Sequence, residues 1–274
     1  WLLFVGLCIF ALPATTGVPV TPTSDSYVIV KARETSSSSS GLNHTTVTGY
    51  NTTGFLAVVD NPLHHFHVYS ATLKDGGCGG YITPSKGARQ HKCQYAVNGG
   101  PFVMGKSSTA QTCMGHVVSD GQTTWSDDSH PNFVQFGLTK NGSFVLGVLT
   151  DEQITELDFV ELVSGFNWLV RDGGVVSTLQ PGGEVAPRTT IGVDASGRLI
   201  LFEADGVEKE TPPVGLTMLQ TAEWVQSLGL LHAINLDGGG SSVSVLDGHV
   251  ISRPSCIDIP VVCERRVTTF MCIK

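Results

Sequence analysis

A ten-residue segment at positions 233–242, AINLDGGGSS, constrains the possible fold and function of this chain most. In it, an apolar strand pattern runs directly into an acid, three glycines and two serines. Glycine lacks a Cβ, so a ligand can approach the main-chain N–H groups, which in such a turn form a concavity suited to phosphate or sugar oxygens. The alternative is an ordinary Asp-Gly hairpin, but a hairpin needs one or two glycines and not three followed by paired serines. The segment therefore predicts a strand that delivers the carboxylate of Asp237 to a binding site.

The rest of the chain is ordinary for a secreted globular protein. Its 274 residues are 41% hydrophobic, enough to bury a core in one domain, and a net charge of -8 argues against a nucleic-acid partner. The apolar start has the length of a signal-peptide core and is too short to span a bilayer. We expect residues 1–17 to be a signal peptide whose true start is absent, 18–54 a partly disordered leader rich in Ser, Thr and Pro, and 55–274 the folded domain.

The cysteines support a secretory location. Removal of the signal peptide discards Cys8 and leaves an even number, which predicts three disulfides with 15 conceivable pairings. Only Cys256 and Cys263 are close enough in sequence to suggest a local pair. A zinc site is the alternative, but no Cys-x-x-Cys occurs and the histidines are not spaced with the cysteines as ligands. Three sequons predict N-glycosylation at Asn43, Asn51 and Asn141.

The hydrophobic pattern predicts an α+β fold, a strand-rich mixed sheet with few flanking helices. Short strands are expected at 27–30, 55–59, 65–69, 95–97, 133–136 and 144–149, between turns rich in Gly, Asn and Asp. Two helices are expected, one from the N-cap Thr150 to Gly165 and one from the N-cap Thr217 to Gly229. The second helix leads directly into the strand before Asp237, which would give that acid a rigid mount.

Four other segments combine a strand with polar residues and glycine. They contain Asn98, Asp120, Arg188 and Asp205. Arg188 enters an apolar strand, where a guanidinium is costly unless it is paired, and it could hold a phosphate bidentately. The alternatives are a structural salt bridge for Arg188 and simple Asp-Gly turns for the two acids.

Two further patterns are weaker. The run at 64–67, HHFH, suggests a metal, but His65 and His67 fall on one face of a strand and His64 on the other, so we expect no metal there. Trp168 precedes Arg171-Asp172-Gly173 and is a candidate for stacking on a sugar ring, although a packing role is the more common one for tryptophan. We expect no cofactor.

These motifs together resemble the phosphodiester glycosidase family. The resemblance runs in one register from about residue 62 to 273 and rests on AVNGG at 96–100, CMGHVVSD at 113–120, RTTIG at 188–192, ADG at 204–206 and the turn at 233–242. It implies disulfides Cys78–Cys113 and Cys93–Cys272 beside Cys256–Cys263. The chain departs from the family pattern at Pro101 and His116, on what would be the rim of the pocket.

The resemblance implies hydrolysis of a glycosyl phosphodiester, removing N-acetylglucosamine from phosphomannose on high-mannose glycoproteins in the secretory pathway and exposing mannose 6-phosphate. The alternatives are a glycosidase for another glycosyl phosphate, such as a cell-wall or exopolysaccharide linkage, and a lectin-like module that only binds sugar phosphates. We predict Asp237, Asp205 and Arg188 as catalytic residues. The predicted substrate-binding residues are Asn98, Gly99, Gly100, Asp120, Thr189, Asn235, Gly238, Gly239, Gly240 and Ser241.

Overall fold

The computed structural model describes residues 26–71, 78, 80–104 and 113–274. These residues form three sheets and three short α-helices, with every pairing between named strands antiparallel. The predicted strand-rich α+β class is confirmed, with three antiparallel sheets in place of one mixed sheet. Within the described ranges, no helix is both long and apolar enough to cross a membrane.

The seven-stranded sheet carries most of the predicted site and runs in the order β12-β11-β15-β13-β14-β3-β2. Its central strands β13 and β14 are buried at every position, although only β14, with the sequence LILFEA, is nearly continuously apolar. The strands are Gly174–Val175 (β12), Asn167–Arg171 (β11), Leu230–Asn235 (β15), Arg188–Asp194 (β13), Leu199–Ala204 (β14), Thr52–Val59 (β3) and Leu42–Gly49 (β2).

The six-stranded sheet runs in the order β1-β9-β8-β10-β6-β7, and the five-stranded sheet in the order β17-β16-β5-β18-β4. The first consists of Tyr27–Lys31 (β1), Ser143–Gly147 (β9), Val134–Thr139 (β8), Phe159–Gly165 (β10), Val117–Ser119 (β6) and Gln122–Trp125 (β7). The second consists of His249–Val250 (β17), Ser244–Leu246 (β16), Tyr95–Asn98 (β5), Thr269–Ile273 (β18) and Phe66–Ser70 (β4). One hydrophobic core joins the three sheets, with buried residues such as Ile191, Phe136 and Met271.

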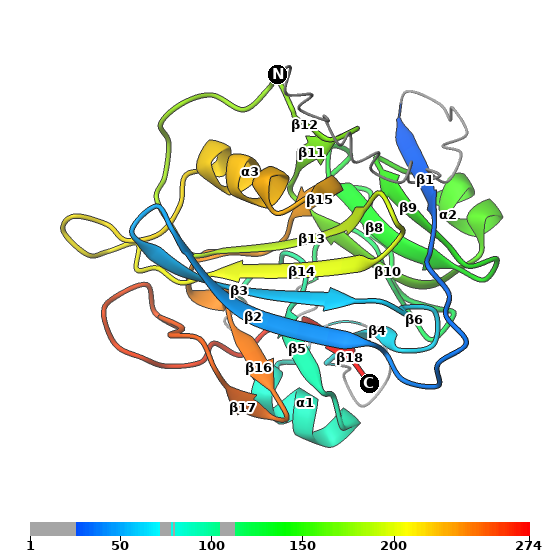
Figure 1. Cartoon of the computed structure of the whole chain (residues 1–274), viewed down its shortest axis with the longest axis horizontal. Coiled ribbons are helices and arrows are strands. Elements are labelled where there is room, and N and C mark those ends of the chain that lie inside the picture. Colours follow the sequence, from blue (N-terminus) through cyan, green and yellow to red (C-terminus); the bar gives the residue numbers. More distant parts are fainter. Residues whose placement is uncertain (1–25, 72–77, 79, 105–112) are drawn as a thin grey trace, which may run out of the picture.

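The three helices lie at the periphery of the sheets (Figure 1). Helix α3, Met218–Ser227, begins at the predicted N-cap Thr217, whose side chain accepts from the Gln220 N–H, and it packs on β11 and β15. Helix α1, Pro84–His91, was not predicted and packs on β5 and β18. Only its first turn carries a clear helix signal, Pro84 after Thr83.

The predicted helix from Thr150 to Gly165 is wrong in its second half. Its N-cap is confirmed, because Thr150 and Gln153 form a reciprocal capping box, but helix α2 covers only Asp151–Leu157. Asp158 then adopts a left-handed conformation at φ 51°, and the following residues form β10. That segment is rich in Phe, Val and Leu, and it pairs with β8 and β6 on both sides, so sheet formation outweighs the helical spacing of its apolar residues.

Part of the expected leader belongs to the sheets. The strand predicted at 27–30 is present as β1, but residues 42–49 also form a strand, β2, at an edge of the seven-stranded sheet. Most positions of β2 are exposed, which explains a threonine-rich sequence that looked unable to pack. The predicted signal peptide at 1–17 lies outside the described residues, and it and the domain boundaries stay predictions.

The disulfides agree with the pairing that the family resemblance implied. Cys78 pairs with Cys113, Cys93 with Cys272, and Cys256 with Cys263. Cys93 follows α1 and Cys272 lies in β18, so this bond joins two segments that are far apart in sequence. The three predicted sequon asparagines are all exposed.

Candidate active site

Three neighbouring strands bring the predicted catalytic residues to one end of the seven-stranded sheet. Arg188 begins β13 and pairs with Ala204, the last residue of β14, so Asp205 follows at the same end. On the other side of β13, Thr190 pairs with Asn235, the last residue of β15, and Asp237 lies two residues further on. Antiparallel pairing thus places a guanidinium between two carboxylate-bearing strand ends.

Asp237 is fixed by its backbone while its side chain stays partly exposed. Its carbonyl accepts a hydrogen bond of 2.7 Å from Asn98 Nδ2, and its N–H donates to the Gly99 carbonyl at 3.2 Å. Burial is the largest influence on the carboxyl group and raises its pKa to about 6, against the opposing effects of Ser241, Arg265 and the Gly238 N–H. A carboxyl group with this pKa can give up and take back a proton near neutral pH, as acid–base catalysis requires.

Arg188 is buried, and backbone carbonyls rather than a close carboxylate hold it in place. Its Nε donates to the Leu216 carbonyl at 3.1 Å and its Nη2 to the Glu184 carbonyl at 2.8 Å. The exposed Glu184 carboxylate lies 3.8 Å away. Nη1 lies 3.8 Å from the position of a Cβ built on Gly238, so the guanidinium reaches the glycine-rich turn. A buried cation with mainly neutral partners favours an anionic ligand.

The turn after Asp237 is closely covered by protein. Gly239 begins a short 3₁₀ turn at φ 56°, and a Cβ at this position would collide with the carboxylate of Glu208. The Gly239 N–H donates to the Pro187 carbonyl at 2.9 Å, and the Gly240 N–H donates to Asp258 Oδ1 at 3.0 Å. The predicted cradle of bare N–H groups is therefore occupied by acceptors of the protein itself, among them one carboxylate.

The carboxylate of Asp258 stands where an anion would bind the turn. It accepts from Gly240 and, at 2.8 Å, from Arg265 Nη2, while Arg265 Nη1 donates to Ser241 Oγ at 3.4 Å. Glu208 lies nearby, with a pKa that burial raises first and Asp258 second. The sequence interpretation missed Asp258, Arg265 and Glu208. They come from loops without hydrophobic periodicity, and the charged run Glu264-Arg265-Arg266 after Cys263 was an available signal.

Beneath the turn lies a buried polar network. Asn98 Oδ1 accepts from Thr189 Oγ1 at 2.8 Å and from the Val243 N–H at 3.3 Å, and Asn98 and Thr189 are fully buried. Gly99 and Gly100 contact Thr269 through their N–H groups, at 2.8 Å to its carbonyl and 2.9 Å to its Oγ1. The geometry of these four predicted binding residues is that of a support for the Asp237 backbone.

Asn235 is also buried, and its Nδ2 donates to the neighbouring Leu236 carbonyl at 2.8 Å. Trp168 lies on β11 opposite Ile234, and the guanidinium of Arg171 stands 5.4 Å from its ring centroid. The ring that was a candidate for stacking on a sugar therefore makes a cation–π contact with Arg171.

Asp205 faces a separate hollow. Its Oδ1 accepts from the Arg253 N–H at 2.7 Å, and burial raises its pKa. It lines a cavity of about 330 Å³ together with Arg253, Ser255 and Val261, and among the described residues neither Asp237 nor Arg188 belongs to that lining. The Cys256–Cys263 loop connects the two places, because Ser255 Oγ donates to the Gly206 carbonyl while Asp258 contacts Gly240.

Asp120 lies elsewhere. It occupies the turn between β6 and β7 with φ 49°, as the Asp-Gly turn alternative predicted, and its side chain contacts His67. Its predicted place in a substrate site with Asp237 therefore has no contact among the described residues to support it.

Comparison with known proteins gives a consistent picture. Residues 91–274 match the family model described as phosphodiester glycosidase. Mouse and human N-acetylglucosamine-1-phosphodiester α-N-acetylglucosaminidases are each 36% identical over 245 residues, which cover 80% of this chain and 45% of the relative. The chain thus spans about half the length of these relatives.

Solved structures extend the likeness to the fold. The zebrafish enzyme's catalytic domain, described as auto-inhibited by its pro-peptide, superposes with a TM-score of 0.76 at 29% identity, covering 90% of this chain and 88% of that one. A hypothetical protein from Synechocystis shares the fold at 15% identity with a TM-score of 0.55, covering 94% of this chain and 64% of that one.

Proposed function

This chain belongs to the phosphodiester glycosidase family, and from that premise we propose that it removes N-acetylglucosamine from a phosphodiester to mannose on glycoproteins. The mammalian relatives are named for action on N-acetylglucosamine-1-phosphodiesters. The three disulfides and these relatives indicate an extracytoplasmic or secretory location. There the substrate would be a phosphorylated high-mannose glycoprotein.

One observation carries the proposal: Asp237, with a pKa near 6, lies two residues after the end of β15, and β15 pairs with the strand that begins with buried Arg188. In the proposed reaction Arg188 binds the phosphate, which is already a good leaving group near neutral pH. Asp237 removes a proton from the attacking water, or stabilises the positive charge that develops on the sugar ring. The turn at 238–241 positions the sugar and phosphate oxygens after they displace the carboxylate of Asp258 from the Gly240 N–H.

Asp205 has a different part in this proposal. It lines the cavity of about 330 Å³ on the far side of Arg188, and that cavity receives the remainder of the substrate beyond the phosphate. Burial raises the pKa of Asp205, so its carboxyl group is sensitive to the charge of whatever binds there.

The test is the release of N-acetylglucosamine from a phosphodiester to mannose by the wild type and by Asp237→Asn. We expect the variant to lose activity by about 100-fold or more, the usual contribution of a general acid or base. Unchanged release in the variant would remove Asp237 from the reaction. Tight binding of the diester by the wild type without release would favour a lectin-like module, and release from a different glycosyl phosphate alone would change the substrate.

A further inference from the structure

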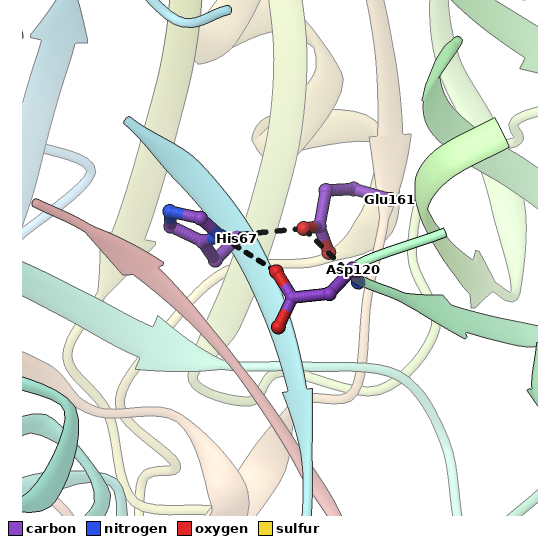
Figure 2. Close-up of side chains that lie close together, drawn as sticks. All are labelled: His67, Asp120 and Glu161. Carbon is purple, nitrogen blue, oxygen red and sulfur yellow. Dashed lines mark hydrogen bonds and ion pairs between the residues drawn. The ribbon is translucent and has the colours of Figure 1, made fainter. Parts of the chain in front are cut away.

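A second cluster of chemically capable side chains lies away from the glycine-rich turn. His67 on β4, Asp120 in the turn between β6 and β7, and Glu161 on β10 point toward one another (Figure 2). His67 Nδ1 lies 3.3 Å from Asp120 Oδ1 and 3.3 Å from Glu161 Oε1. The three potential ligand atoms all lie within 4.8 Å of one another.

These distances fit a metal ion better than they fit hydrogen bonds. A tetrahedral zinc ion with ligands at about 2.0–2.2 Å separates neighbouring ligand atoms by about 3.3–3.6 Å. Nδ1 carries at most one hydrogen, so it cannot donate well to two carboxylate oxygens at equal distance. Because the three atoms lie within 4.8 Å of one another and the Asp120 side chain is exposed, a small shift of Asp120 would let one ion contact all of them.

The ligands are also oriented as a metal site requires. Glu161 is buried, and its Oε2 accepts a hydrogen bond of 2.7 Å from the Val68 N–H, which turns Oε1 toward His67. Such outer contacts fix the orientation of metal ligands. Oε1 also accepts from the Asp120 N–H at 3.3 Å, and an ion beside it would supply the positive charge that favours burial of a carboxylate. The Asp120 side chain is 65% exposed, which leaves room for a water molecule in the fourth position.

The other comparable group among the described residues is less suited. In the cluster of His116, Asp128 and Asp151, Asp128 lies 3.5 Å from Nε2 and Asp151 lies 3.4 Å from Nδ1. The close contacts thus use opposite ring nitrogens, which do not converge on one ion. Both carboxylates there are exposed, so neither is a buried charge that requires a cation.

We propose that His67, Asp120 and Glu161 bind a divalent transition-metal ion such as Zn²⁺, which takes both imidazole and carboxylate ligands. The ion would tie the β6–β7 hairpin to β4 and β10. This reverses the expectation of no metal at the histidine run, because the partners of His67 come from other strands and not from its own. The proposal does not depend on the proposed glycosidase reaction.

The experiment uses the full chain, freed of metal with a chelator and dialysed. Zn²⁺ binding is measured by calorimetry, Co²⁺ binding by visible absorption, and Tm is recorded with and without Zn²⁺. At about 100 times the dissociation constant, Zn²⁺ should raise the Tm of the wild type by roughly 5–10 °C. His67→Gln and Asp120→Asn should lower Zn²⁺ affinity by about 10-fold or more and remove most of that rise.

Two control variants make the result specific. His64→Gln changes an exposed histidine of the same run, and His116→Gln changes the other cluster; both should keep the Zn²⁺-dependent rise in Tm. Asp120→Asn alters an exposed side chain, so its fold can be verified by an unchanged Tm in chelator. The absence of Zn²⁺ binding in the wild type, or binding that survives His67→Gln and disappears in His116→Gln, would overturn the proposal.

Discussion

The carboxyl group of Asp237 ionises at a cost to the folded state, because burial raises its pKa to about 6 from the ordinary value of 3.8. The folded protein therefore holds this proton more tightly than the unfolded chain does. The contribution of this group to the free energy of unfolding is fully present below pH 4 and is lost as the pH rises through 6. The full shift corresponds to about 3 kcal/mol, and screening of a partly exposed carboxylate reduces this to about 1–2 kcal/mol.

At pH 7.5 the free energy of unfolding of Asp237→Asn should therefore exceed that of the wild type by about 1–2 kcal/mol, although the variant loses activity. The amide cannot ionise, so the penalty disappears. Denaturant unfolding at pH 7.5 and at pH 4 measures the effect, and the gain should shrink toward zero at the lower pH. An equal gain at both pH values would show that the variant stabilises by packing and not by removing a charge.

Wild-type activity should depend on the same proton. If Asp237 acts in its ionised form, kcat/KM on the diester should rise with an apparent pKa near 6 and level off above pH 7. A pH profile of kcat/KM checks this. A profile that falls across the same range would mean that the protonated form of Asp237 is the active one.

Arg188→Ala should discriminate between substrates. Only a diester presents a phosphate, so the variant should lose far more kcat/KM on the phosphodiester than on a simple aryl glycoside, with a difference of about 100-fold, as expected for a lost charge-assisted bidentate contact. Arg188→Lys retains the charge but not the forked geometry of the guanidinium. Its kcat/KM on the phosphodiester should lie between those of the wild type and Arg188→Ala. Equal losses on both substrates would mean that Arg188 only supports the Leu216 and Glu184 carbonyls.

At this scale the sequence predicts some residues of the site and not others. Asp237 and Arg188 were predicted because each lies where an apolar segment meets polar residues, and strand pairing brings the two residues to one end of the sheet. Asp258 and Arg265 were missed because a loop closed by a disulfide places them, and loop geometry leaves no periodic signal. Asn98 was predicted as a substrate-binding residue, which stays a prediction, and its hydrogen bonds show that it supports the Asp237 backbone.

Helix α3 matters to the site because it packs on β15, the strand that leads into Asp237. Its first turn is held by Thr217, whose Oγ1 accepts from the Gln220 N–H at 3.2 Å, while the Gln220 side chain accepts from the Thr217 N–H at 2.9 Å. The helix then stops before Gly229, which adopts φ 92°.

Thr217→Ala should lower the free energy of unfolding by about 1 kcal/mol, the usual cost of losing an N-cap side chain. Thr217→Ser should restore most of it, since serine supplies the same oxygen. Chemical denaturation of the three proteins measures the difference. A loss of the same size in Thr217→Ser would show that the methyl group, and not the cap, is responsible.

Elements were predicted well where one kind of signal acted alone. The strands around Phe144 and Tyr95 were identified from apolar runs between turn residues, and they are buried central strands. The segment at 159–165 combined an apparent helical spacing with strand-forming residues. It forms strand β10 because it pairs with a neighbouring strand on each side. Strand β2 was missed for the opposite reason, because an exposed edge strand can be almost entirely polar.

Across the whole molecule, two of the disulfides differ greatly in how much chain they enclose. Cys93 and Cys272 are 179 residues apart, whereas Cys256 and Cys263 are 7 residues apart. A crosslink restricts the unfolded chain more when it closes a longer loop. The chain-entropy estimate is about 5 kcal/mol for the long loop and about 2.5 kcal/mol for the short one. The first value is comparable with the whole stability of a typical domain.

Replacing Cys93 and Cys272 with alanine should therefore reduce the free energy of unfolding by about 5 kcal/mol, and replacing Cys256 and Cys263 by about half as much. The short-loop variant should nevertheless lose more affinity for the diester, because its loop carries the Asp258 contact with Gly240 and the Cys256 carbonyl that binds Arg265. Equilibrium denaturation of both double variants measures their stability, and KM for the diester reports their substrate binding. If the long-loop variant were the one with the weaker substrate binding at a temperature where both are folded, the loop at 256–263 would have no special part in the site.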